Sequence, residues 1–365
     1  MTSKLSEPQP KRQGPLAVTI KEVAARARVS VATVSRVLNG KGPVREDTWR
    51  RVLDVAQDMR YVPHGVARSL STRRSNTIGV VLPDLYGEFF SEVIRGIDVA
   101  ARRDGYHLLL SGSHSETSEM SAVLAAVRGR VDGLIVMSPD VEASALCASL
   151  PEGTPVVLLN CLTKDGCAIT IDNYGGAYQM VRHLTALGHR RIAFIAGPAR
   201  NVDACERLRG YRDAMHRFVT RQTAALEFPG EFNEETGFEA GKRILELSPR
   251  PTAIFAANDA MAIGAMYALR SADTDVPAEI AVAGFDDIPI ARYVYPPLTT
   301  VSVAIAELGR RSFEMLLKVI ENGPGQKQET LPATLLIRES CGAAQAARTA
   351  GQYSRKRMAF SPSTP

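Results

Sequence analysis

A chain of 365 residues with 45% hydrophobic and 23% charged side chains is long enough for two or three soluble globular domains. No apolar run approaches the roughly 18 residues that a membrane-spanning helix needs, and the N-terminal segment lacks the apolar core of a secretory signal, which argues against membrane and exported proteins. The five cysteines form no CxxC pair, so the sequence predicts a cytoplasmic protein with reduced thiols, without disulfides or a zinc site.

The charge is unevenly distributed along the chain. Residues 1–75 carry 15 Lys and Arg against 6 Asp and Glu, a net +9, whereas residues 76–340 carry a net −8. A basic head on an acidic body predicts that the head alone contacts a polyanion, the alternative being a solvated surface of uneven charge. The small, polar segments 1–17 and 341–365 are expected to be disordered, and the second of these is basic.

The first strong pattern in the chain is TIKEVAARARVSVATVSRVLNG, which begins at Thr19. Thr19 and Glu22 form a capping box, in which each side chain satisfies a backbone amide at the start of a helix. A tight break follows, and Ser30 is a natural N-cap for a second helix. Two short helices joined by a tight break predict a helix-turn-helix.

The second helix has two contrasting faces. A step of about 100° per residue puts Val34, Val37 and Leu38 on one face and Ala32 and Arg36 on the other. An arginine can pair with guanine in the major groove, and an alanine can touch a thymine methyl group. The outer face therefore predicts a DNA-reading helix, the alternative being a small three-helix bundle with no DNA role.

A third helix is predicted at about 46–59, and Pro63 prevents it from continuing much further. The residues available to close a small core are Val52, Leu53, Ala56 and Met59.

Residues 19–72, including VLDVAQDMRYVPHGVARSLST, resemble the DNA-binding head and hinge of the lactose/galactose repressor family. The resemblance implies a helix-turn-helix domain at 18–62 and a hinge helix and linker at 63–75. The residues that it implies for base reading are Val31, Ala32 and Arg36. Those that it implies for contacts with the DNA backbone are Thr19, Ser30, Thr33, Ser35, Asn39 and Thr48.

The resemblance also implies that Ala67 and Leu70 of the hinge enter the minor groove, where a leucine pair can wedge open a base step. The hinge segment is too short to form a stable helix alone, so we expect it to fold only on operator DNA. Two residues depart from the family pattern. His64 replaces an asparagine in the hinge, and Arg45 stands where the third helix usually has a serine cap.

From residue 76 onward, short β-rich runs alternate with helical stretches, the pattern of buried parallel strands joined by crossover helices. These runs are TIGVVLP, YHLLLSG, GLIVMSP, PVVLLN, AITID, RIAFIAG, AIFAAN and IAVAGFDD. The fold class expected is an all-α head plus an α/β body of two doubly wound parallel-sheet subdomains. Residues 76–340 resemble the periplasmic-binding-protein-like (type I) effector domain of the same family. The resemblance implies dimerisation through this body and three crossings between the subdomains, the last near 296–302.

Effector-binding candidates follow the strands, since ligands of such folds bind at the carboxyl ends of strands. They are Asp84, Phe89, Phe90, Asp203, Arg207, Phe232, Asn258 and Asp286. Packing is the alternative for the two phenylalanines that follow the first strand, and helix capping is the alternative for Asp84. The resemblance supports Arg207 and Asp286. Val303 stands where some sugar-binding members carry a glutamine, which argues against assuming a lactose-like or galactose-like ligand.

No phosphate loop, metalloprotease or hydrolase motif is present, so neither an enzyme nor a bound cofactor or metal is expected. The leading hypothesis is a homodimeric repressor of a carbohydrate or small-metabolite operon, with a sugar or sugar derivative as effector. Whether the effector releases the protein from a pseudo-palindromic operator or locks it there stays open. A transporter's solute-binding protein is the alternative, but it would need an export signal and would not need a basic head. The tail lacks the leucine heptads of the tetrameric lactose repressor, which favours a dimer.

Overall fold

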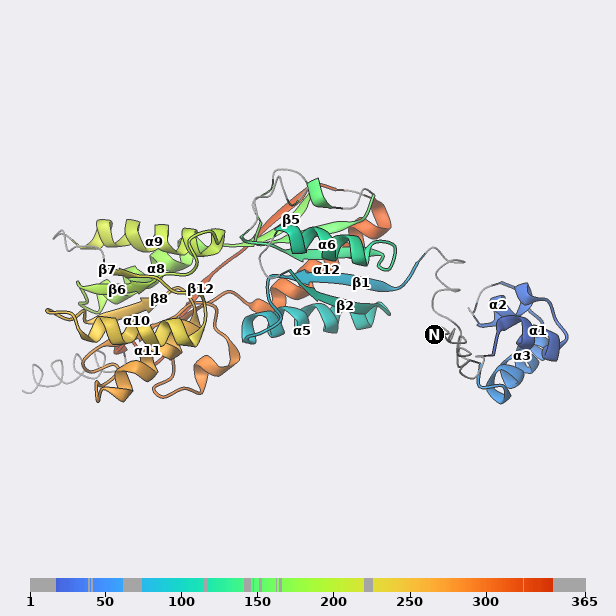
Figure 1. The fold of residues 1–365 in the computed structure, drawn as a ribbon, viewed down its shortest axis with the longest axis horizontal. Coiled ribbons are helices and arrows are strands. Elements are labelled where there is room, and N and C mark those ends of the chain that lie inside the picture. Colours follow the sequence, from blue (N-terminus) through green and yellow to red (C-terminus); the bar gives the residue numbers. More distant parts are fainter. Residues whose placement is uncertain are drawn as a thin grey trace, which may run out of the picture. The chain divides into compact units, whose positions relative to one another are not determined.

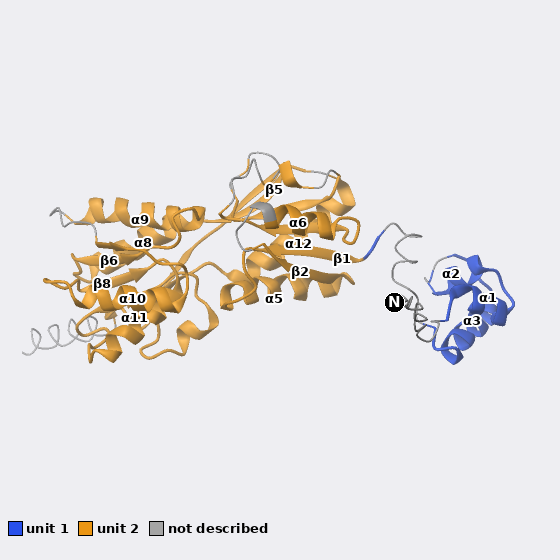
Figure 2. Ribbon diagram, viewed as in Figure 1, with its two compact units in different colours: residues 1–75 blue, residues 76–365 orange. Residues whose placement is uncertain are grey.

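The computed structural model describes residues 18–38, 40, 42–61, 74–113, 117–140, 146, 148–150, 153–161, 163, 166–219, 226–323 and 325–343. The chain divides into two compact units, Met1–Ser75 and Asn76–Pro365 (Figure 2). Three residues with an expected DNA contact, Asn39, Ala67 and Leu70, lie outside the described residues. The expected disordered end at 1–17 and most of the expected hinge lie outside them as well.

The head consists of three helices, α1 (Ile20–Ala27), α2 (Val31–Leu38) and α3 (Glu46–Asp58). Thr19 and Glu22 make the predicted capping box at the start of α1. The chain leaves α1 through Arg28, which has a left-handed backbone with φ of 54°. Ser30 then accepts a hydrogen bond from the Thr33 amide at 3.1 Å, as an N-cap does. Local capping chemistry thus fixes the break between the two helices.

The head has a small core of short side chains. Its buried members are Val23, Ala24, Ala27, Val34, Val37, Val52 and Ala56. The expectation that Leu53 would join this core is wrong, because its side chain is 42% exposed. Leu53 follows Val52 by one residue and therefore points about 100° away from the face of α3 that packs. Met59 is half-buried at the edge of the core.

The first part of the body is built on a sheet of six parallel strands in the order β11-β5-β4-β3-β1-β2 (Figure 1). Its strands are β1 (Thr77–Leu82), β2 (His107–Gly112), β3 (Gly133–Met137), β4 (Val156–Leu159), β5 (Cys167–Ile171) and β11 (Lys327–Leu331). Side chains alternate between the two faces. Val80 and Leu82 join the core under α5 (Glu88–Arg103) and α12 (Ile305–Asn322). Val81 joins the core under α6 (Thr117–Val127).

The second part of the body has a parallel sheet in the order β7-β6-β8-β9. Its strands are β6 (Ile192–Ile195), β7 (Leu226–Phe228), β8 (Ala253–Ala256) and β9 (Ala281–Ala283). Its helices are α8 (Asn173–Ala186), α9 (Val202–Phe218), α10 (Glu234–Leu245) and α11 (Asp259–Ser271), with α8 packed on α9 and α10 on α11 (Figure 1). Both doubly wound sheets were predicted. The eight β-rich runs correspond to β1–β6, β8 and β9.

The crossings between the two parts correct one expectation. The chain passes from β5 to α8, from β10 (Thr300–Ser302) to α12, and finally from β11 to β12 (Thr334–Leu336). Residues 296–302, expected to hold the last crossing, thus lie just before the second one. The sequence missed this because β11 is a polar edge strand, KQETL, that returns to the first sheet, and β12 then pairs antiparallel with β10.

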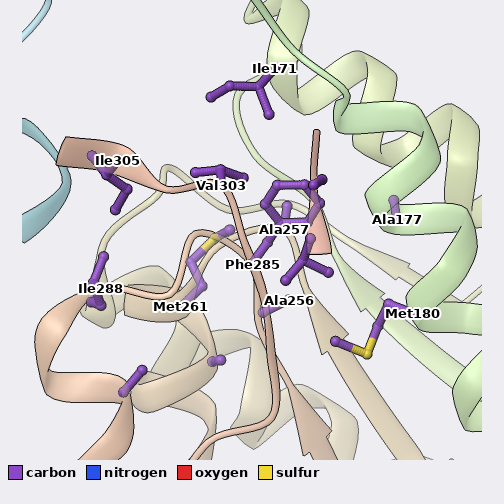
Figure 3. Close-up of a cluster of buried hydrophobic side chains, with 14 of the residues drawn as sticks. Ile171, Ala177, Met180, Ala256, Ala257, Met261, Phe285, Ile288, Val303 and Ile305 are labelled. Atoms are coloured by element: carbon purple, nitrogen blue, oxygen red, sulfur yellow. The ribbon is translucent and has the colours of Figure 1, made fainter. Parts of the chain in front are cut away.

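An apolar cluster occupies the region where the crossing segments meet the second sheet (Figure 3). Val303 lies between β10 and α12, is fully buried, and belongs to this cluster together with Phe285 and Met261. Cys341 is also fully buried, so the expected disordered tail at 341–365 begins too early, and residues 344–365 lie outside the described part. No helix within the described ranges is long and apolar enough to span a membrane.

Candidate functional site

The exposed side of α2 carries the residues expected to read DNA bases. Val31, Ala32 and Arg36 are all exposed there, while Val34 and Val37 are buried beneath them. Thr33 and Ser35 are half-buried at the edge of this surface, as is Thr48 on α3. The predicted division of α2 into an inner apolar face and an outer polar face is confirmed.

The capping residues of the head have local roles besides any contact with DNA. Thr19 donates its hydroxyl to Glu22 Oε2 at 3.0 Å, and these hydrogen bonds lower the pKa of the Glu22 carboxyl. The hydroxyls of Ser30 and Thr33 lie 2.9 Å apart at the start of α2. These contacts hold the ends of both helices, and hence the orientation of the exposed side of α2.

In the body, Arg207 is the centre of a buried polar network, hereafter the Arg207 network. Its guanidinium donates through Nε to Asn173 Oδ1 at 2.8 Å and through Nη1 to the Ala257 carbonyl at 2.6 Å. Its Nη2 lies 3.0 Å from Asp286 Oδ1, an ion pair in which both side chains are almost completely buried. The guanidinium carbon lies 3.9 Å from the centroid of the Phe285 ring, which covers it.

Asp203 joins the network from the first turn of α9. One carboxylate oxygen accepts from Asn173 Nδ2 and the other from Asn160 Nδ2, both at 2.7 Å. Asn160 follows β4 of the first sheet, whereas Asp203 belongs to the second part of the body, so this hydrogen bond joins the two parts. The Val202 amide reinforces the junction by donating to the Pro139 carbonyl at 3.0 Å.

Burial dominates the electrostatics of the acidic groups. It raises the pKa of Asp203 and of Asp286 to about 6 in each case, although Arg207 opposes both shifts. Asp259, at the start of α11, is fully buried, and burial raises its pKa well above the ordinary value. Its oxygens accept from the Thr300 hydroxyl at 2.5 Å and from the Ile288 amide at 2.9 Å. Three carboxyl groups thus gather around one guanidinium.

The network lies where parallel strands end. Asn160 follows β4, Asn173 follows β5, Ala257 follows β8 and Asp286 follows β9. Asn160, Asp286 and Phe232 have positive φ values of 51°, 110° and 60°. Left-handed backbones are uncommon outside glycine and persist where the surroundings hold them, often at binding sites.

The other predicted effector residues are placed differently. Asp84 is exposed and its Oδ1 accepts from the Leu85 and Tyr86 amides, so it closes a turn, and Gly87 occupies the N-cap of α5. Phe89 and Phe90 are half-buried and packed edge to face, with centroids 5.5 Å apart. These three residues make none of the Arg207 network's contacts described above.

Asn258 and Phe232 lie beside the network but are bonded to each other. Asn258 caps α11 by accepting from the Met261 amide at 3.0 Å, and it donates to the Phe232 carbonyl at 2.9 Å. The Phe232 ring lies 5.8 Å from the guanidinium carbon of Arg207. The side chain of Asn258 therefore holds the loop that presents Phe232.

Sequence reasoning missed Asn160, Asn173 and Asp259. The first two follow the runs PVVLLN and AITID, and the third follows AIFAAN. The same rule that selected Asp203 and Asp286, a polar residue directly after a strand, selects these three as well. Among the described residues, no group of three His, Cys, Asp or Glu side chains could hold a metal ion.

Comparison with known proteins decides the family. Residues 19–64 match the model of bacterial regulatory proteins of the lacI family, and residues 181–341 match a periplasmic binding protein-like domain. The chain is 32% identical to the transcriptional repressor CytR of Escherichia coli over 89% of its length and 96% of the relative. The chain belongs to the lacI family. It is a DNA-binding transcription regulator with a periplasmic-binding-protein-like body.

Other relatives agree with this assignment. The ribose operon repressor of E. coli is 34% identical over 88% of this chain and 98% of the relative, and the regulator RegA of Clostridium saccharobutylicum is 35% identical over 84% and 93%. A lac repressor dimer bound to operator and the anti-inducer ONPF matches with a TM-score of 0.82 and 31% identity, over 89% of this chain and 99% of that one. These relatives are transcription regulators rather than enzymes.

Proposed function

We propose that this regulator is a repressor that binds a pseudo-palindromic operator as a homodimer and responds to a sugar or sugar derivative bound at the Arg207 network. The observation that carries the DNA-binding half is the exposed face of α2, which presents Ala32 and Arg36 within the segment that matches the family's DNA-binding head. A single helix of this size reads only a few base pairs, so two copies are needed to select one operator. The protein then acts in the cytoplasm, where its operator is.

The proposed input lies between the two parts of the body. The hydrogen bond between Asn160 and Asp203 joins them across the Arg207 network. An effector that binds one arrangement of the two parts more tightly shifts the population toward that arrangement and so changes operator affinity. Similar chains carry bound sugars: a lacI-family regulator from Enterococcus faecium with ribose matches with a TM-score of 0.66 and 27% identity, over 72% of this chain and 98% of that one.

A gel-shift titration with the region upstream of the protein's own gene tests the DNA-binding half. We expect Arg36→Ala to weaken specific binding by about 1–3 kcal/mol, roughly ten- to a hundredfold, and affinity to fall steeply with salt. Arg26→Ala on α1 removes the same charge from an exposed position away from α2 and is the matched control. Equal losses in the two variants, or binding that ignores salt, would contradict the proposal.

A thermal-shift screen across sugars, sugar phosphates, nucleosides and nucleobases tests the input half. A ligand of the body should raise the unfolding midpoint and change operator affinity in the same concentration range. Asp286→Asn keeps the shape of the side chain and should abolish that stabilisation. A ligand whose effect survives Asp286→Asn binds elsewhere.

A further inference from the structure

The Arg207 network has spent its hydrogen-bond donors on the protein itself. Each of the three guanidinium nitrogens of Arg207 already faces a protein acceptor. The amide nitrogens of Asn173 and Asn160 donate to Asp203, and that of Asn258 donates to a backbone carbonyl. A ligand that needs donors from these side chains would have to displace existing bonds.

Unused acceptors remain in the same place. Asn160 is 2% exposed, and its Oδ1 is buried with no hydrogen-bond partner among the described residues. The orientation of this amide is fixed, since its nitrogen is 2.7 Å from an Asp203 carboxylate oxygen. Asp286 Oδ1 is also buried, and beyond its ion pair with Arg207 it accepts no bond of normal geometry within the described ranges. Buried acceptors without donors are costly, so a partner that supplies donors is favoured there.

The charge around these acceptors has the same consequence. Asp203, Asp286 and Asp259 face a single guanidinium, and Arg207 is the only Lys, Arg or His among the buried side chains in the described part of the chain. Burial has already raised the pKa values of these carboxyl groups, which shows that further negative charge is disfavoured there. The Phe285 ring covers one face of the guanidinium at 3.9 Å and restricts approach from that side.

We infer that the effector is a neutral polyol or its amino derivative, which donates hydroxyl or amino hydrogens to Asn160 Oδ1 and Asp286, and not a sugar phosphate or sugar acid. This inference rests on the proposed function, because it names the chemical class of the ligand at the same site. Hydroxyl groups donate and accept, and an ammonium group donates only, so both satisfy a network of this composition. A phosphate or carboxylate only accepts and would meet three carboxyl groups.

The test compares matched ligands on the full-length protein bound to a fluorescent operator. The pairs are ribose with ribose 5-phosphate, glucose with glucose 6-phosphate, galactose with galacturonate, and cytidine with its 5′-monophosphate, and glucosamine serves as the amino probe. We expect the members that change operator affinity to be neutral or amino-bearing, and their anionic counterparts to bind at least about tenfold more weakly by titration calorimetry. A phosphorylated or oxidised member that acts at lower concentration than its neutral counterpart would overturn the inference.

Two variants separate charge recognition from a general loss of binding. Asp203→Asn removes one carboxylate from the network and should narrow the gap between neutral and anionic members. Asp213→Asn makes the same charge change at an exposed position of α9 and should leave the gap unchanged. An anionic effector that controls operator binding refutes this inference and leaves the repressor function standing. Failure to bind any specific operator refutes the proposed function itself.

Discussion

The head and the body use polar side chains in opposite ways. In the head, Ala32 and Arg36 are exposed on one side of α2, and the core beneath them contains only small apolar residues. In the body, Arg207 and Asp286 are almost completely buried and hold each other in place. A duplex can be read only by a surface that is already exposed, whereas a small ligand is selected by groups withdrawn from water. Binding and stability should therefore be separable in the head and coupled in the body.

The largest expected effect tests this coupling directly. Arg207→Ala should destabilise the body by about 3–5 kcal/mol, because it leaves Asp286 buried without its counter-ion. Denaturant unfolding measures this loss. Arg209→Ala, two residues further along α9, breaks only an exposed pair with Glu206 and should stay below about 1 kcal/mol. Comparable losses at the two positions would mean that the network does not stabilise the body.

Helix packing in the body gives the next effect. A Cβ added to Gly96 of α5 would lie 2.0 Å from the Ala306 carbonyl oxygen of α12, where only backbone could move. Gly96→Ala should therefore destabilise the body by about 3 kcal/mol, at the upper end for overpacking. Arg103→Ala, exposed on the same helix, is the control and should change the unfolding midpoint little. A neutral Gly96→Ala would show that α5 and α12 can separate freely.

The pH dependence of stability gives a smaller effect with a definite sign. Burial raises the pKa of Asp203 to about 6, so between about pH 4 and 6 the folded protein holds a proton that the unfolded chain has lost. Stability from this carboxyl is therefore lost as the pH rises through that window. Relative to Asp203→Asn, wild type should lose about 2 kcal/mol between pH 4 and 7, less than full linkage gives because Asp203 is partly exposed.

Glu307 provides the opposite case for the same titration. Hydrogen bonds from Arg310 and Arg311 lower the pKa of this carboxyl to about 2. Its contribution is present above the unfolded pKa and is lost as the pH falls from about 4.5 toward 2. Glu307→Gln should therefore flatten the acid limb only. If both variants altered the same pH range, the assignment of the two shifts would be wrong.

The smallest expected effect is a gain in the head. Arg45 occupies the N-cap of α3 and makes no side-chain capping bond. Arg45→Ser would supply a hydroxyl acceptor for the first amides of α3 and should stabilise the head by about 1 kcal/mol. Thermal unfolding followed by the fluorescence of Trp49, the protein's single tryptophan, which packs against the head core, reports this change. An unchanged midpoint would show that these amides are already satisfied.

The sequence by itself determined the features that depend on neighbours along the chain. The capping box at Thr19, the N-cap at Ser30, the two faces of α2 and eight of the strands follow from local spacing and hydrogen bonding. The positions of Arg207, Asp203 and Asp286 after their strands followed from the same logic. Residues of this kind are readable because the interaction that fixes them spans only a few positions.

Only the tertiary structure decided which of these residues meet. Asn160 and Asp203 are 43 positions apart, and Arg207 and Ala257 are 50 apart, so no local pattern could pair them. The return of β11 to the first sheet was equally hidden, because the order of strands depends on packing across the whole body. The helix ends of the head are local chemistry, whereas the acceptor-rich network that we propose selects the effector exists only once both sheets are folded.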